Sequence, residues 1–94
     1  MTWEVIYHKD VDSDLKSVGP AAARRIILKI NEKLTKAPDK FGVPLSNDLK
    51  NFWKLRIGDF RVVYQVLSKK IIVFVLAVGP RRDKEIYRSA SKRI

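Results

Sequence analysis

The sequence predicts one α+β domain over residues 1–94: an N-terminal strand, a two-helix hairpin, a three-stranded antiparallel meander and a C-terminal helix. One stretch carries apolar residues at helical spacing, and three later runs are rich in β-branched and aromatic residues. A chain of 94 residues has room for one hydrophobic core. The apolar fraction of 46% favours a folded domain over a disordered chain.

The first half contains the predicted strand and helix pair. Residues 3–8 alternate between large apolar side chains and other side chains, which predicts a strand. A short helix is expected from Asp12 or Ser13 through Lys16. Residues 20–37 have an apolar stripe with basic residues on the other faces, which is typical of an amphipathic helix.

The second half contains the predicted meander. Residues 39–51 hold glycine, proline and asparagine and are expected to form a connecting loop. Strands are expected at residues 52–57, 60–67 and 71–78. The last of these is apolar on both faces, so it should lie inside the sheet with both faces covered. Residues 81–94 are expected to form a basic terminal helix.

A hairpin is predicted where Gly58 and Asp59 separate the first two strands of the meander. A two-residue connection fixes the register, and here it sets Arg56 directly opposite Arg61. Strand alternation then places the apolar side chains together on one face, which we expect the helix pair to cover. These side chains are Trp53, Leu55, Ile57, Phe60, Val62 and Tyr64.

The opposite face of this hairpin is cationic. Lys54, Arg56 and Arg61 share it, and the facing arginines repel each other by up to roughly 1 kcal/mol. A bound phosphate relieves this repulsion, because guanidinium groups bind phosphate through two hydrogen bonds. Arg81 follows the last strand and Tyr87 lies in the terminal helix, where an aromatic ring can stack a nucleobase. With 20 Lys and Arg against 10 Asp and Glu, the net charge of +10 also predicts a polyanionic partner.

Several classes of protein are disfavoured by composition. The sequence has no cysteine and one histidine, which excludes thiolate chemistry and disfavours a metal site. Its apolar runs are too short to span a bilayer, and no signal-peptide pattern opens the chain. We therefore expect a cytoplasmic protein with no membrane attachment, no metal and no small-molecule cofactor.

The second half of the chain resembles the RelE toxins of the RelE/ParE superfamily. Residues 53–64 read WKLRIGDFRVVY, followed by Val78-Gly79, Arg81, Tyr87 and the ending ASKRI. The order of elements resembles this family over nearly the whole chain. The resemblance implies the RelE-like fold, which is a microbial ribonuclease-like fold.

The resemblance also implies a function. A RelE toxin of a type II toxin–antitoxin system is a metal-independent endoribonuclease that cuts mRNA on the ribosome, inhibits translation and is neutralised by a RelB-like antitoxin. In such a reaction the RNA 2′-hydroxyl attacks the adjacent phosphate, which requires a proton acceptor, a charge stabiliser and a proton donor. Position by position, the resemblance implies Lys54 as general base, Arg61 as phosphate binder, Arg81 as general acid and Tyr87 as stacking residue. Arg56 and Arg82 are expected to add phosphate contacts.

Alternative interpretations remain open. A ParE-like inhibitor of DNA gyrase and a non-catalytic basic nucleic-acid-binding protein both fit the charge. A basic strand face is often only a solvated surface, and Tyr87 equally fits a partly buried helix position. Phe52 stands where RelE toxins often have another lysine. The remaining basic residues are interpreted as surface charges, among them Lys29, Lys33, Lys36, Arg88, Lys92 and Arg93.

Overall fold

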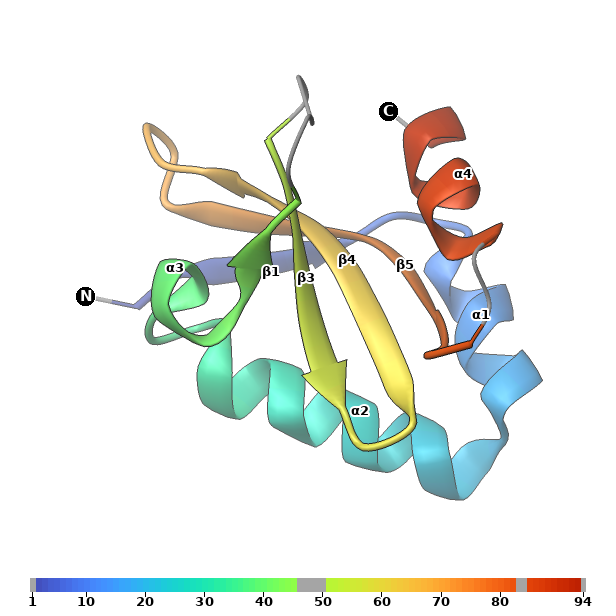
Figure 1. The fold of residues 1–94 in the computed structure, drawn as a ribbon. Helices are drawn as coiled ribbons and strands as arrows, with labels where there is room; N and C mark the ends of the chain where they lie inside the picture. The colour runs from blue at the N-terminus through green and yellow to red at the C-terminus, as the bar shows by residue number, and fades with distance from the viewer. Residues whose placement is uncertain (1, 46–50, 83–84, 94) are drawn as a thin grey trace.

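The computed structural model describes residues 2–45, 51–82 and 85–93 (Figure 1). Within them, one sheet has the strand order β1-β5-β4-β3-β2. The strands are β1 (Glu4–Tyr7), β2 (Val43–Pro44), β3 (Phe52–Ile57), β4 (Phe60–Leu67) and β5 (Ile72–Pro80). The helices are α1 (Val11–Val18), α2 (Pro20–Lys33), α3 (Pro38–Phe41) and α4 (Glu85–Lys92). The predicted α+β class is confirmed.

Strand β5 lies inside the sheet, where it pairs with β1 in parallel and with β4 in antiparallel orientation. Its interior position follows from its sequence, because a strand that is apolar on both faces needs cover on both. This part of the prediction is confirmed. The strand ends later than predicted, since Gly79 and Pro80 still lie opposite Arg61 and Phe60 in the ladder.

The β3–β4 hairpin has the predicted register, with Arg56 opposite Arg61 and Leu55 opposite Val62. Gly58 takes a φ of 56°, in the left-handed region where a glycine lacks the steric penalty of other residues. A positive φ at this position is what a two-residue hairpin turn requires. The turn therefore sets which side chains of both strands face the helices and which face away.

The segment predicted as a loop, residues 39–51, is partly structured: the short helix α3 and the strand β2 fall within residues 38–44. The Tyr64 hydroxyl, fully buried in the core, donates a hydrogen bond to the carbonyl oxygen of Pro38 at 2.7 Å. Gly42 passes so close to this hydroxyl that an added Cβ would collide with it. This anchoring depends on a residue distant in sequence, so local pattern did not reveal it. Residues 46–50 of the predicted loop lie outside the described residues.

Two layers of helix cover the sheet (Figure 1). One face packs on α1 and α2 through a core that includes Val11, Ile26, Ile30 and Leu34. On the other face, Ile86 and Ala90 of α4 are buried against β4 and β5 in a second cluster. The predicted cover of one face by a helix pair is confirmed, while α4 covers only part of the other face. The side of that face formed by β3 lies beyond α4.

A bulge adapts β5 to α4. The register shifts between Val63 and Tyr64, which pair with Ala77 and Val75, so Leu76 is an extra residue in β5. Consequently Leu76 and Ala77 both belong to the cluster beneath α4. A bulge of this kind turns two successive side chains toward one face and is common beside functional sites.

We expect Tyr64→Phe to destabilise the protein in a pH-dependent way. At neutral pH the loss of the bond to Pro38 should cost about 1 kcal/mol, because a buried carbonyl loses its donor. Burial, aided by the charge of Asp39, raises the pKa of Tyr64 above its ordinary value of 10.0. The stability contributed by this hydroxyl is therefore complete below pH 10 and is lost as the pH rises toward the folded pKa.

Urea unfolding at neutral pH and above about pH 10 measures both effects. The wild type should lose more stability over this alkaline range than Tyr64→Phe. Equal unfolding midpoints at neutral pH, with parallel alkaline losses, would contradict the prediction.

Candidate nucleic-acid interface

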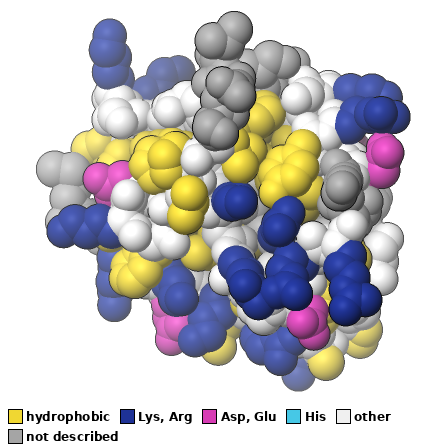
Figure 2. Space-filling model, viewed as in Figure 1, with side chains coloured by type: hydrophobic (Ala, Val, Ile, Leu, Met, Phe, Trp, Pro, Cys, Tyr) yellow, Lys and Arg dark blue, Asp and Glu magenta, His cyan; other side chains and the backbone are white. Residues whose placement is uncertain are grey.

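A pocket of about 370 Å³ opens at the β3 side of the sheet. It is lined by Lys33, Phe41, Val43, Lys54, Leu55, Arg56, Arg61 and Arg81. Among these lining residues five are Lys or Arg and none is Asp or Glu. Figure 2 shows Lys and Arg side chains gathered over the lower ends of β3 and β4 on this face. A concave surface with one sign of charge concentrates anions.

The structure brings together most of the residues selected from the sequence. Lys54, Arg56 and Arg61 reach the pocket from the hairpin, and Arg81 reaches it from the end of β5. The backbone N–H of Arg81 donates to the carbonyl oxygen of Asp59 at 2.7 Å, which ties the chain after β5 to the hairpin turn. Arg82 is exposed and is not among the lining residues, so its predicted phosphate contact lies outside this pocket.

Tyr87 joins this group through Arg61. The Nη1 of Arg61 donates a hydrogen bond to the Tyr87 hydroxyl at 2.7 Å, and its guanidinium carbon lies 5.8 Å from the ring centroid. Tyr87 is half-buried and packs beside the cluster beneath α4, so it is also the partly buried helix residue that the alternative interpretation described. The hydrogen bond holds the guanidinium of Arg61 in place on the cationic face.

Charge neutralisation is concentrated elsewhere on the described surface. Arg56 donates only a long bond of 3.4 Å to the carbonyl of Gly58. Acidic residues instead pair with neighbours on their own helices, as in Asp12–Lys16, Lys29–Glu32 and Glu85–Arg88. The facing arginines of the hairpin therefore keep their mutual repulsion, which an anion bound between them relieves.

The sequence analysis did not assign Lys33, Phe41 or Val43 to this pocket. Lys33 was interpreted as a charge that solvates α2, whereas the structure places it in the pocket, with its Nζ 5.6 Å from the ring centroid of Phe41. Phe41 lies on α3, within the segment predicted as a loop. Only the tertiary placement of α3 beside β3 reveals this pair, because neither residue belongs to a periodic pattern that points to the pocket.

Arg93 was interpreted as a surface charge, but its side chain is only 15% exposed. It makes two hydrogen bonds to the carboxylate of Asp14, at 2.6 and 3.1 Å, and one to the carbonyl of Leu76 at 2.9 Å. Asp14 also accepts the N–H of Val78 at 3.0 Å. The hydrogen bond to Asp14 raises the pKa of Arg93. This pair fastens the C-terminal end of α4 to α1 and β5, and so fixes the helix that carries Tyr87.

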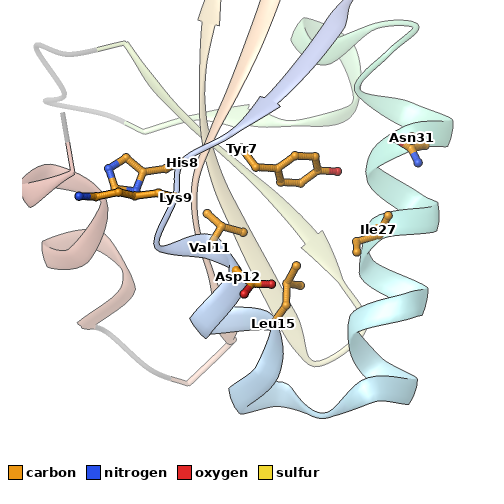
Figure 3. A pocket seen from close by; sticks show the side chains of 8 residues that line it. All are labelled: Tyr7, His8, Lys9, Val11, Asp12, Leu15, Ile27 and Asn31. Carbon is orange, nitrogen blue, oxygen red and sulfur yellow. The ribbon is translucent and has the colours of Figure 1, made fainter.

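A second pocket, of about 390 Å³, lies between β1, α1 and α2 (Figure 3). Tyr7 points from β1 toward α2, and Val11, Leu15 and Ile27 contribute apolar walls. The buried hydroxyl of Tyr7 has no hydrogen-bond partner in the described part of the chain, and burial raises its pKa. Lys9 is the single cationic residue among those that line this pocket. This pocket therefore lacks the convergent cations that the pocket beside β3 offers to a polyanion.

The described ranges 2–45, 51–82 and 85–93 contain no group of three or more His, Cys, Asp or Glu side chains suited to hold a metal ion. None of their helices has the length and apolar character needed to cross a bilayer.

Comparison with known proteins identifies the family. Residues 5–85 match the ParE toxin family of the type II toxin–antitoxin system parDE. The chain belongs to this family. A putative RelE-like toxin protein of Escherichia coli is 30% identical over 98 residues, covering 100% of this chain and 99% of that protein. The mRNA interferase toxin RelE of Escherichia coli K12 is 51% identical over 41 residues, which span 44% of this chain and 43% of RelE. The chain thus matches less than half the length of this RelE.

Solved structures agree with this family. The archaeal RelE–RelB complex of Pyrococcus horikoshii OT3 contains a chain similar to this one, with a TM-score of 0.70, 32% identity and coverage of 87% of this chain and 98% of that chain. The RelBE2 complex of Mycobacterium tuberculosis is similar in fold, with a TM-score of 0.80 at 23% identity over 88% of this chain and 95% of that chain. The RelE/ParE resemblance and the RelE-like fold are confirmed.

We expect Asp14→Ala to loosen α4. The substitution removes the carboxylate that is hydrogen-bonded to Arg93, leaves the longer ion pair with Asp10 at 3.8 Å, and takes the acceptor from the N–H of Val78. We expect a cost on the order of 3 kcal/mol for this largely buried pair. Urea unfolding measures this loss. Asp12→Ala, on the same helix, breaks only an exposed pair with Lys16 and should leave the unfolding midpoint unchanged. Equal midpoints for the two variants would show that the Asp14–Arg93 pair does not hold α4.

Proposed function

We propose that this protein is the toxin of a type II toxin–antitoxin system and that it inhibits translation by cutting mRNA on the ribosome. The observation that carries this proposal is the convergence of Lys54, Arg61 and Arg81 in one cationic pocket, with Tyr87 bound to Arg61. The similarity to a protein named mRNA interferase toxin RelE supports it. We propose the cytoplasm as its location, because translating ribosomes and mRNA are found there.

The reaction that we propose for this pocket uses no metal. Lys54, as the proposed general base, accepts the proton of the RNA 2′-hydroxyl while the oxygen of that hydroxyl forms a bond to the adjacent phosphorus. The bond from phosphorus to the 5′-oxygen of the next nucleotide breaks, which leaves a 2′,3′-cyclic phosphate and a 5′-hydroxyl. Arg61 and Arg56 stabilise the negative charge on the phosphate oxygens. Arg81 stabilises the negative charge on the departing 5′-oxygen, which takes up a proton from water, and Lys54 releases the proton that it accepted to water.

Tyr87 serves this site in two ways. Its ring offers a surface on which a nucleobase stacks, beside the phosphate-binding Arg61. Its hydroxyl accepts one of the five N–H donors of that guanidinium, so the remaining donors stay available for a phosphate. Phosphate and tyrosine therefore bind Arg61 together, without competing for the same hydrogen.

The partner that silences the toxin is proposed to be a RelB-like antitoxin. The similar chain from Pyrococcus horikoshii OT3 was solved in a complex with RelB, which supports this assignment. A net charge of +10 also favours an acidic partner. Co-expression with its cognate antitoxin should restore growth and yield a complex that survives purification.

We expect Arg61→Ala and Arg81→Ala each to lower mRNA cleavage by at least about 100-fold, because each removes a charge that stabilises the transition state. Primer extension on mRNA from translating ribosomes measures the cleavage, and growth on induction measures toxicity. Arg24→Ala is the matched control, since it removes the same charge from the exposed face of α2. Full toxicity of either pocket variant would disprove its assigned role, provided that circular dichroism shows a native fold.

Binding to single-stranded RNA should weaken with salt in proportion to the phosphates that the pocket neutralises. A plot of the logarithm of the association constant against the logarithm of the salt concentration should have a slope of about −0.7 per neutralised phosphate. Arg61→Ala should make this slope shallower by about 0.7. Fluorescence anisotropy over a range of salt concentrations measures it. A response that does not change with salt would rule out recognition through phosphate.

A gyrase inhibitor is the second candidate function, because the matching family is described as ParE toxins. The two candidates differ in what primer extension detects. New mRNA ends that require translating ribosomes support the mRNA interferase. DNA damage on expression, with no new ends, supports the gyrase inhibitor.

A further inference from the structure

The cationic pocket extends beyond the proposed reaction site to Phe41 and Lys33, which have no part in the chemistry described above. We propose that these two residues form a second nucleotide subsite for single-stranded RNA, in which the Phe41 ring stacks a base and the Lys33 ammonium binds the adjacent phosphate. This inference rests on the proposed function, since it assigns where a neighbouring nucleotide of the same RNA lies.

Phe41 is an aromatic side chain held exposed at a fixed place. It is 49% exposed, whereas Phe52 is only 5% exposed. Its short helix is anchored to the core by the hydrogen bond from Tyr64 to Pro38 and by the close approach of Gly42 to the same hydroxyl. The ring is thus presented to solvent by an anchored segment, which limits the entropy lost when a ligand binds to it.

Lys33 supplies the charge that a nucleotide subsite needs. It is the last residue of α2, and its Nζ lies 5.6 Å from the Phe41 ring centroid. Proteins that bind single-stranded nucleic acid combine aromatic platforms with cationic side chains that follow the backbone. Phe41 and Lys33 form such a combination on one wall of the pocket.

The position of this pair fits the path of a strand of RNA. Arg61 lies on β4, and Lys54 and Arg56 lie on the neighbouring strand β3. The next strand, β2, begins two residues after Phe41 with Val43, which lies opposite Lys54. In Figure 1, α3 and α4 stand on opposite sides of β3 and β4. An RNA that crosses the pocket therefore meets Tyr87 at one end and Phe41 at the other, with the scissile phosphate between them.

Charge favours RNA over a protein as the occupant of this patch. Exposed Phe41 and Val43 alone would suit an apolar protein contact. They share their pocket with five Lys and Arg residues and with no acidic one, however, which is a poor match for an apolar partner. Bases with phosphates on either side match both features at once.

The test uses the full chain and a fluorescent RNA pentamer that carries 2′-O-methyl riboses, so that it cannot be cut. Anisotropy at low salt gives the dissociation constant of the intact pentamer and of five versions, each with one abasic position. We expect two positions at which loss of the base weakens binding by the wild type. Phe41→Ala should weaken binding of the intact pentamer by about tenfold and should abolish sensitivity at one of these positions. Tyr87→Ala should abolish it at the other.

Matched variants isolate the stacking. Phe41→Trp should restore binding and Phe41→Leu should not, because leucine is apolar but has no π face. Leu28→Ala removes another exposed apolar side chain, from α2, and should change nothing. Circular dichroism checks that each variant is folded. Because the Phe41 side chain is exposed, we expect its substitutions to leave the fold intact.

The outcomes separate this inference from the proposed function. If Arg61→Ala weakens binding of the pentamer while Phe41→Ala leaves both affinity and abasic sensitivity unchanged, the second subsite is wrong and the RNA-cutting function stands. Unchanged RNA binding combined with loss of a protein complex in Phe41→Ala would assign the patch to a protein instead. If the wild type neither binds the pentamer nor cuts mRNA on ribosomes, the proposed function and the subsite are both overturned.

Discussion

The register of the β3–β4 hairpin is the constraint on which the rest of the structure depends. Because side chains alternate along a strand, a slip of one residue would turn Leu55 and Val62 to solvent and the cations toward the helices. The positive φ of Gly58 and the apolar face against α1 and α2 both prevent this slip. The free energy gained by burying the apolar face is therefore what holds Arg56 and Arg61 opposite each other, despite their repulsion.

The distribution of acidic groups completes the site. Asp14 fastens Arg93 at the end of α4, and the helix-surface acids pair with Lys16, Lys29 and Arg88. The pocket lining contains no acid, so its positive potential is not cancelled from within. The Tyr87 hydroxyl is a neutral partner, which orients Arg61 without neutralising it. The same protein thus uses ion pairs to hold its helices and leaves the charges of the hairpin available to a ligand.

Local patterns explain what could be predicted from the sequence and what could not. The hairpin register, the interior placement of β5 and the facing arginines follow from turn chemistry and from alternation over a few residues. The link between Arg93 and Asp14 spans 79 positions, and the anchor between Tyr64 and Pro38 spans 26. No periodicity signals such contacts, so Arg93 was interpreted as a surface charge and α3 as loop. Phe41 and Lys33 were missed for the same reason, since their proximity exists only once α3 is anchored beside β3.

The fold does not by itself choose between cutting RNA and inhibiting gyrase, because the matching family is described as ParE toxins while the similar proteins are named RelE. The choice depends on a few side chains on a shared sheet. Five cations line one cavity, and each like-charged pair among them costs the sheet stability. These cations are Lys33, Lys54, Arg56, Arg61 and Arg81, and Tyr87 holds the guanidinium of Arg61 in place. Phosphoryl chemistry without a metal requires such a cluster, because protein cations must then balance the charge of the transition state. The protein keeps this cluster although the repulsion between its cations lowers the stability of the sheet. This observation favours a nuclease.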